Sequence, residues 1–132
     1  MLKTIGVGLS VPGKLRSKNE DRFLLDDRLG LYIVCDGIGG HPRGDRAAEL
    51  AIRTIARSLE EVRPALRATR ERRADPAVAL AEARRAVKRA NDALYQRDRE
   101  LPSSQRMGTT VALMLNAGWR AILATVGDSR IY

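Results

Sequence analysis

The apolar residues of this chain follow two different spacings, one typical of strands and one typical of helices. Short apolar runs bounded by turn-forming residues predict strands. They cover residues 4–9, 23–26, 30–35, 109–115, 119–126 and 131–132. Turn residues at 26–30 and 116–118 join two neighbouring pairs of these runs, so we expect two β-hairpins.

Between the strands, apolar residues recur every three or four positions, which is the spacing of one helix face. Over residues 45–62 they are Ala48, Ile52, Ile55, Leu59 and Val62. Over about residues 75–99 they are Leu80, Ala83, Val87, Ala90 and Leu94. Residues 63–74 are polar and charged, and we expect an exposed connection there. Strands followed by helices and then by strands again predict an α+β fold with the helices packed on a sheet.

Length and charge narrow the partners that this chain can have. At 132 residues we expect a single domain. Basic residues outnumber acidic ones by 24 to 16, and residues 63–89 hold much of that excess. The five aromatic residues do not alternate with basic ones, so nucleic-acid binding is the least favoured interpretation of this charge.

Two features indicate where the protein works. No apolar run has the length of a membrane span, and glycine and proline interrupt the start of the chain, unlike a signal peptide, so we expect no membrane partner. Cys35 is the single cysteine and lies within an apolar strand. We expect it to be a core residue of a cytoplasmic protein rather than a nucleophile.

The apolar run at residues 31–35 ends in Asp36, which is followed by a turn with three glycines. A carboxylate at the end of a buried strand is costly unless a positive group neutralises it. If the preceding hairpin turns near Leu29, Asp21 lies opposite Asp36. Two opposed carboxylates with Glu20 beside them favour a divalent cation, Mg²⁺ or Mn²⁺. The alternative is a polar turn before the hairpin and an aspartate that caps a loop.

Three further side chains are suited to phosphate chemistry. Arg16 is a solvated residue when taken alone, and a bidentate phosphate ligand if a metal site lies beside it. His41 follows the glycine turn, and it is either a surface residue or a proton-transfer group near neutral pH. Asp128 lies in a tight turn between strands, where a local hydrogen-bonded turn is the simpler interpretation.

Four short motifs occur in an order that is typical of one family. They are RSKNED at 16–21, VCDGIGGHPRGD at 34–45, GTT at 108–110 and GDSR at 127–130. Together they resemble the bacterial PP2C-type (PPM) metal-dependent serine/threonine protein phosphatases, over about residues 4–132. The resemblance implies part of a PP2C-like β-sandwich of antiparallel sheets flanked by two long helices, with a two-metal site at one end.

The resemblance also implies a role for each acidic motif. Asp36 would bridge two Mn²⁺ or Mg²⁺ ions, and the Gly37 carbonyl would bind one of them. Glu20 and Asp21 would hold metal-bound waters. Asp128 would bind a third, more weakly held metal.

For Arg16, the resemblance implies a contact with the substrate phosphate. The expected reaction is hydrolysis of phosphoserine or phosphothreonine in a substrate protein by a metal-activated water. Ile38 stands where eukaryotic members of the family have a histidine proposed as general acid, but bacterial members commonly have an apolar residue there.

The chain departs from the family most clearly at its end. It stops after GDSR, before the family's DG and DN motifs, whose aspartates complete the metal site. We therefore expect residues 1–132 to be a truncated amino-terminal portion that self-associates or pairs with a missing carboxy-terminal half, because its apolar sheet surface would lack cover. The alternative function is a catalytically incomplete module that binds a phosphopeptide or a partner chain.

Overall fold

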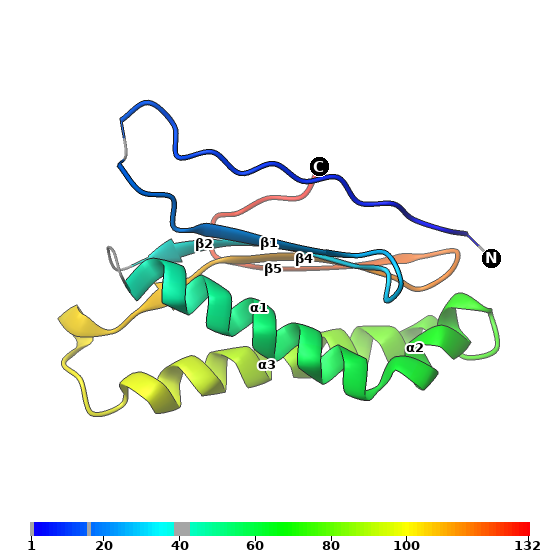
Figure 1. The fold of residues 1–132 in the computed structure, drawn as a ribbon. Coiled ribbons are helices and arrows are strands. Elements are labelled where there is room, and N and C mark those ends of the chain that lie inside the picture. The colour runs from blue at the N-terminus through cyan, green and yellow to red at the C-terminus, as the bar shows by residue number, and fades with distance from the viewer. Residues whose placement is uncertain (1, 16, 39–42) are drawn as a thin grey trace.

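An antiparallel sheet carries helices on one of its faces (Figure 1). In this computed structural model, residues 2–15, 17–38 and 43–132 are described. The strands are β1 (Asp21–Asp26), β2 (Leu31–Ile38), β3 (Gly108–Thr109), β4 (Val111–Asn116) and β5 (Ala121–Val126). The helices are α1 (Arg43–Glu61), α2 (Arg63–Arg70), α3 (Pro76–Asp98) and the short 3-10 helix η1 (Ser103–Gln105). The order β1-β2-β4-β5, with β3 paired to β2, confirms the predicted α+β fold.

The hairpin of β1 and β2 has the predicted register. Phe23 lies opposite Val34, and Asp21 lies opposite Asp36. Side chains alternate between the two faces of a strand. Leu31 and Cys35 of β2 are fully buried against the helices, whereas Val34 points to the other face and is about half exposed.

Helix α1 buries the face that its spacing predicts. Ala48, Ile52, Ile55 and Leu59 are all buried in the core that forms between the helices and the sheet. Within the described residues, no helix combines the length and the apolar composition needed to cross a membrane. The amphipathic spacing of α1 therefore serves packing on the sheet.

Helix α3 buries most of the face that its spacing predicts, together with a row of small residues beside it. Its buried residues include a stripe of alanines at 79, 83, 86 and 90, whereas Leu80 is 48% exposed. These alanines form part of the same core cluster as Ala48 and Ala51 of α1, and the two helices lie side by side (Figure 1). Small side chains allow two helix backbones to approach closely. The prediction was correct for Ala83 and Ala90, which are buried, and for Val87 and Leu94, which pack against the core while partly exposed. It was wrong for Leu80.

The predicted exposed connection between the long helices is in part a third helix, α2. Pro64 stands in its first turn, where a missing backbone N–H costs little. Leu66 and Thr69 are fully buried, and the Thr69 hydroxyl donates to the Leu66 carbonyl over 2.7 Å. The expectation of an exposed connection was wrong for these two residues. The arginines on the outer side of α2 give the segment a polar composition, which hides a helix that only two buried residues anchor.

The segments at residues 4–9 and 131–132 do not form the predicted strands. The first of them follows the sheet on the side opposite the helices (Figure 1). It is held by a 2.8 Å hydrogen bond between the Tyr32 and Thr4 hydroxyl groups and by another, also 2.8 Å, from the Gly6 N–H to Asp27 Oδ1. A strand requires a neighbouring backbone for its ladder of hydrogen bonds. The described residues provide no such ladder here.

The outer face of the sheet is apolar and only partly covered. Phe23, Leu25, Val34 and Leu123 share this face, and each remains more than one third exposed. This observation confirms the expectation of an apolar sheet surface that lacks full cover.

Candidate metal centre at the end of β2

Two carboxylates face each other where β1 begins and β2 nears its end. Asp21 and Asp36 are register partners, so their side chains leave the same face of the sheet. Both residues are partly buried. Like charges at directly opposed positions repel each other. This pair is therefore a location where a cation would be stabilised.

Three backbone segments meet beside this pair in very close contact. A Cβ placed on Gly37 would lie 2.0 Å from the Gly44 carbonyl oxygen in α1. A Cβ placed on Gly44 would lie 2.4 Å from Glu20 Oε2 and 3.0 Å from the Gly37 carbonyl carbon. The two glycines thus bring a carboxylate oxygen and a backbone carbonyl together, and any side chain at either position would fill this space.

The backbone of Asp36 is held from both sides by the threonines of the GTT motif. The Asp36 N–H donates to Thr110 Oγ1 over 3.0 Å. Its carbonyl accepts from the Thr110 N–H over 2.9 Å and from the Thr109 hydroxyl over 3.0 Å. These three bonds fix the peptide units on either side of the aspartate, and hence the direction in which its carboxylate leaves the strand.

The GDSR turn is tied to the same threonine. The Ser129 and Thr110 hydroxyl oxygens are 2.5 Å apart, and Thr110 is only 2% exposed. Gly127 has a φ of +89°, and a Cβ there would lie 2.9 Å from Thr110 Cγ2. Asp128 itself is exposed. The structure therefore connects the GDSR motif to Asp36 through the hydroxyl groups of Ser129 and Thr110, and not through Asp128, the predicted metal ligand.

Arg22 adds a positive charge at the start of β1. Its Nη1 donates to the carbonyls of Asp21 and Asn19, over 2.8 Å and 3.1 Å. Its Nη2 lies 3.6 Å from Asp45 Oδ2 in the first turn of α1. Arg22 thereby links the strand and the helix that flank the carboxylate pair.

Four of the predicted site residues, Glu20, Asp21, Asp36 and Gly37, come together at this edge of the sheet. Arg16 and His41 lie outside the described residues. The roles of Thr109, Thr110 and Arg22 were not predicted. The GTT motif was the available signal for the threonines, but their bonds to Asp36 cross 73 and 74 positions of sequence.

The donor atoms at this edge are carboxylate and carbonyl oxygens, which suit Mg²⁺ or Mn²⁺ better than zinc. Among residues 2–15, 17–38 and 43–132, no group of three or more acidic, histidine or cysteine side chains is arranged to hold an ion. A divalent cation bound here would therefore take its remaining ligands from water or from residues beyond this set.

Cys35 precedes Asp36 but points into the core. It is fully buried. Burial raises the pKa of its thiol to about 12, although a hydrogen bond with Thr109 acts in the opposite direction. The thiol is therefore protonated at neutral pH, and its full burial confirms Cys35 as a core residue.

The role of Thr110 can be tested by removing its hydroxyl while keeping its shape. We expect Thr110→Val to lower the free energy of unfolding by about 1–3 kcal/mol, because the Asp36 N–H loses its buried acceptor. Urea denaturation measures this change. Thr125→Val, on an exposed position of β5, is the matched control and should change stability by less than about 0.5 kcal/mol. Equal stability of Thr110→Val and the unaltered chain would contradict the assignment.

The chain is similar to known proteins along nearly its whole length. It matches the family model described as Protein phosphatase 2C over residues 16–132. The serine/threonine phosphatase stp of Listeria monocytogenes is 30% identical over 123 residues, covering 91% of this chain and 46% of that protein.

Solved structures have the same fold. The crystal structure of the Mycobacterium tuberculosis serine/threonine phosphatase PstP/Ppp aligns with a TM-score of 0.71 at 32% identity, covering 92% of this chain and 46% of that chain. The catalytic domain of PstP in complex with two manganese ions also aligns with a TM-score of 0.71, at 31% identity over 92% of this chain and 47% of that one. The chain thus spans just under half the length of these relatives.

Proposed function

This chain belongs to the protein phosphatase 2C family, and from that membership we propose that it forms the amino-terminal part of a metal-dependent protein serine/threonine phosphatase. The proposed reaction is hydrolysis of phosphoserine or phosphothreonine in a protein substrate. When bound, Mn²⁺ or Mg²⁺ supplies an activated water and neutralises charge on the phosphoryl group.

The observation that carries this proposal is the pairing of Asp21 with Asp36 across the β1–β2 hairpin, with Gly37 next in the strand and Glu20 beside Gly44. In the proposal, Asp36 and the Gly37 carbonyl hold the metal ions directly. Glu20 and Asp21 orient water beside them.

The remaining motifs complete the proposed site. Thr109 and Thr110 keep Asp36 in position through its backbone. Arg16 binds the substrate phosphate through a bidentate contact, and Asp128 binds a further metal ion. Self-association or a carboxy-terminal half would supply the other ligands.

A titration with Mn²⁺ tests this proposal on the full chain. Calorimetry measures Mn²⁺ binding, release of p-nitrophenol from p-nitrophenyl phosphate measures hydrolysis, and light scattering records the oligomeric state. We expect Asp36→Asn to weaken Mn²⁺ binding by at least about tenfold and to abolish any metal-dependent hydrolysis, because it removes an anionic ligand. Asp92→Asn removes the same charge from an exposed position of α3 and should leave both measurements unchanged.

The same measurements distinguish the proposed phosphatase from a second candidate function, a phosphopeptide-binding module without catalysis. That candidate is favoured by the small number of acidic ligands that the described residues bring together. Mn²⁺ binding that depends on Asp36 but is not accompanied by hydrolysis would favour the module. A folded chain that binds Mn²⁺ equally well with and without Asp36 would overturn the proposed metal centre.

A further inference from the structure

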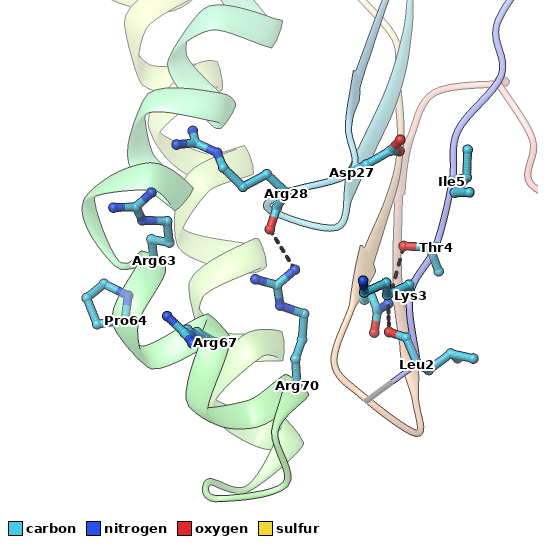
Figure 2. Close-up of a pocket in the computed structure, with 11 residues that line it drawn as sticks. Leu2, Lys3, Thr4, Ile5, Asp27, Arg28, Arg63, Pro64, Arg67 and Arg70 are labelled. Carbon is cyan, nitrogen blue, oxygen red and sulfur yellow. Dashed lines mark hydrogen bonds between the residues drawn. The ribbon is translucent and has the colours of Figure 1, made fainter.

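A second candidate site lies at the end of the sheet opposite the carboxylates. It is a cavity of about 730 Å³ between α2, the turn that joins β1 to β2, and the start of the chain (Figure 2). Its cationic lining residues are Lys3, Arg28, Arg63, Arg67 and Arg70, and we call it the arginine cleft. Strand β2 begins at Leu31 beside the cleft and reaches Gly37 six residues later, which is roughly 20 Å at about 3.3 Å per residue.

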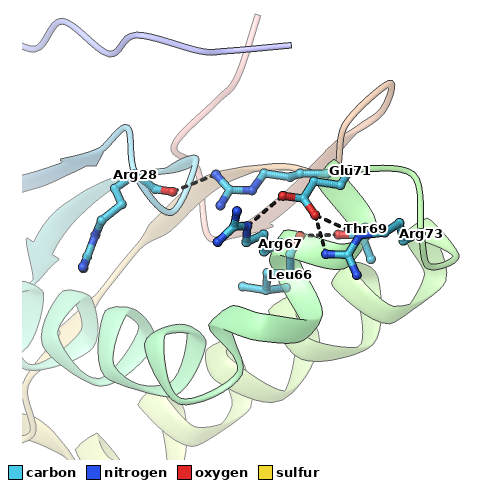
Figure 3. A network of polar contacts seen from close by, with 7 residues as sticks. Arg28, Leu66, Arg67, Thr69, Glu71 and Arg73 are labelled. Carbon is cyan, nitrogen blue, oxygen red and sulfur yellow. Dashed lines mark hydrogen bonds and ion pairs between the residues drawn. The ribbon is translucent and has the colours of Figure 1, made fainter. Parts of the chain in front are cut away.

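The carboxylates beside the arginine cleft are too few for its guanidinium groups. Glu60 lies 3.3 Å from Arg28 Nη2 and 3.4 Å from Arg63 Nη1, so one carboxylate serves two arginines. Glu71 is shared in the same way by Arg67, over 2.7 Å, and by Arg73 (Figure 3). Two carboxylates thus face four guanidinium groups.

The guanidinium groups of Arg67 and Arg73 lower the pKa of Glu71, the carboxylate that they share. Hydrogen bonds from Arg67 first, and then from Arg73, lower the pKa of Glu71 to about 2. Glu71 is therefore ionised at neutral pH.

Arg70 adds a charge that has no carboxylate partner within the described residues. Its Nη1 donates to the Arg28 carbonyl over 2.8 Å, which joins α2 to the hairpin turn. Its Nε is buried and lacks a hydrogen-bond partner in the part of the chain that the structure describes. Asp27, the one carboxylate among the described residues that line the cleft, already accepts from the Gly6 N–H and the Tyr32 hydroxyl.

The arginine cleft also has an apolar side at the start of the chain, where Leu2 and Ile5 line it. Pro64 lines the opposite wall from α2, next to Arg63 (Figure 2). Ile5 is 83% exposed and Leu2 is 65% exposed, so both have free apolar surface. A ligand that carried only charge would leave this surface in water.

We propose that the arginine cleft binds a small organic phosphate, with the phosphoryl groups on the guanidiniums of Arg63 and Arg67 and the organic part against Leu2 and Ile5. Guanidinium groups match phosphate oxygens in a planar, bidentate geometry. The cavity volume falls within the range of about 300–1,000 Å³ that is typical of small-molecule sites. The site is separate from the proposed metal centre and does not depend on it.

Calorimetry with two probes tests the proposal on the full chain in the presence of EDTA, which prevents binding through metal ions. The probes are pyrophosphate and ADP, at constant ionic strength. We expect ADP to bind more tightly than pyrophosphate because only ADP reaches the apolar side. The double variant Arg63→Gln/Arg67→Gln should weaken ADP binding at least tenfold, and both replaced residues are exposed, so the fold should persist.

A matched control separates a defined site from general charge attraction. Arg84→Gln/Arg97→Gln removes the same two charges from exposed positions of α3 and should change ADP affinity less than twofold. Equal losses in the two double variants would overturn the proposal, as would a folded unaltered chain that fails to bind ADP. Loss of binding in Asp36→Asn would place the phosphate at the metal centre and would overturn it as well.

Discussion

Replacing Gly37 by alanine is expected to destabilise the protein by about 4 kcal/mol or more, among the largest effects of a single substitution. The new Cβ would lie 2.0 Å from the carbonyl oxygen of Gly44 and 2.2 Å from the carbonyl carbon of the same residue. Both atoms belong to the backbone of the first turn of α1, so neither can rotate away. The strand and the helix would have to separate at the proposed metal centre.

Urea denaturation followed by circular dichroism measures this loss. Gly108→Ala is the matched control, because Gly108 is paired with β2 beside Gly37 and a Cβ there would meet nothing within 4 Å. We expect the control to be neutral or stabilising by less than about 1 kcal/mol, since alanine restricts the unfolded chain. A Gly37→Ala chain as stable as the control would show that β2 and α1 do not meet as described.

Native Cys35 is expected to react with a thiol reagent at least about 1,000-fold more slowly than an exposed cysteine. Burial raises the pKa of its thiol from 9.0 to about 12. Below pH 9, the fraction of thiolate is therefore about 1,000-fold lower than in an exposed cysteine. Full burial also prevents the reagent from reaching the sulfur. The rate of labelling by DTNB at pH 8 measures this protection.

The control places the only cysteine in an exposed position. Ser104→Cys in a Cys35→Ala chain should react at the rate of a free thiol, because Ser104 is exposed in η1. Addition of urea to the unaltered chain should bring Cys35 to that same rate. If native Cys35 reacts within tenfold of the control, the assignment of Cys35 to the core is wrong.

The same pKa shift predicts how stability depends on pH. The folded-state pKa of Cys35 lies above the value of 9.0 in an unfolded chain, so the protonated thiol favours folding. This contribution is fully present below pH 9 and is lost as the pH rises toward 12. The urea midpoint should therefore fall more steeply over that range for the unaltered chain than for Cys35→Ala.

The β1–β2 register shows how far local patterns can determine a fold. Side chains alternate with a period of two, and a short turn leaves few ways to pair the strands. These two facts placed Asp21 opposite Asp36 before any tertiary contact was considered. The same reasoning identified the buried face of α1, because its large apolar residues lie on one stripe.

Other parts of the chain depend on contacts between distant segments. Residues 63–74 are polar and charged, which predicted an exposed connection. Helix α2 forms there because Leu66 and Thr69 are buried, and their burial depends on elements elsewhere in the sequence. The buried stripe of α3 consists of alanines, since the neighbouring α1 leaves room only for small side chains.

Local patterns in the sequence were thus enough to predict the hairpin register, the long helices and the acidic edge that is typical of the family. The support of Asp36 by Thr110 and Ser129, the position of the start of the chain, and the gathering of arginines from α2 and the β1–β2 turn around one cavity emerge only when the chain is folded. The difference lies in the sequence distance over which each interaction acts. Periodicity and turn geometry act over a few residues, whereas these contacts join groups that are brought together only when the helices pack on the sheet.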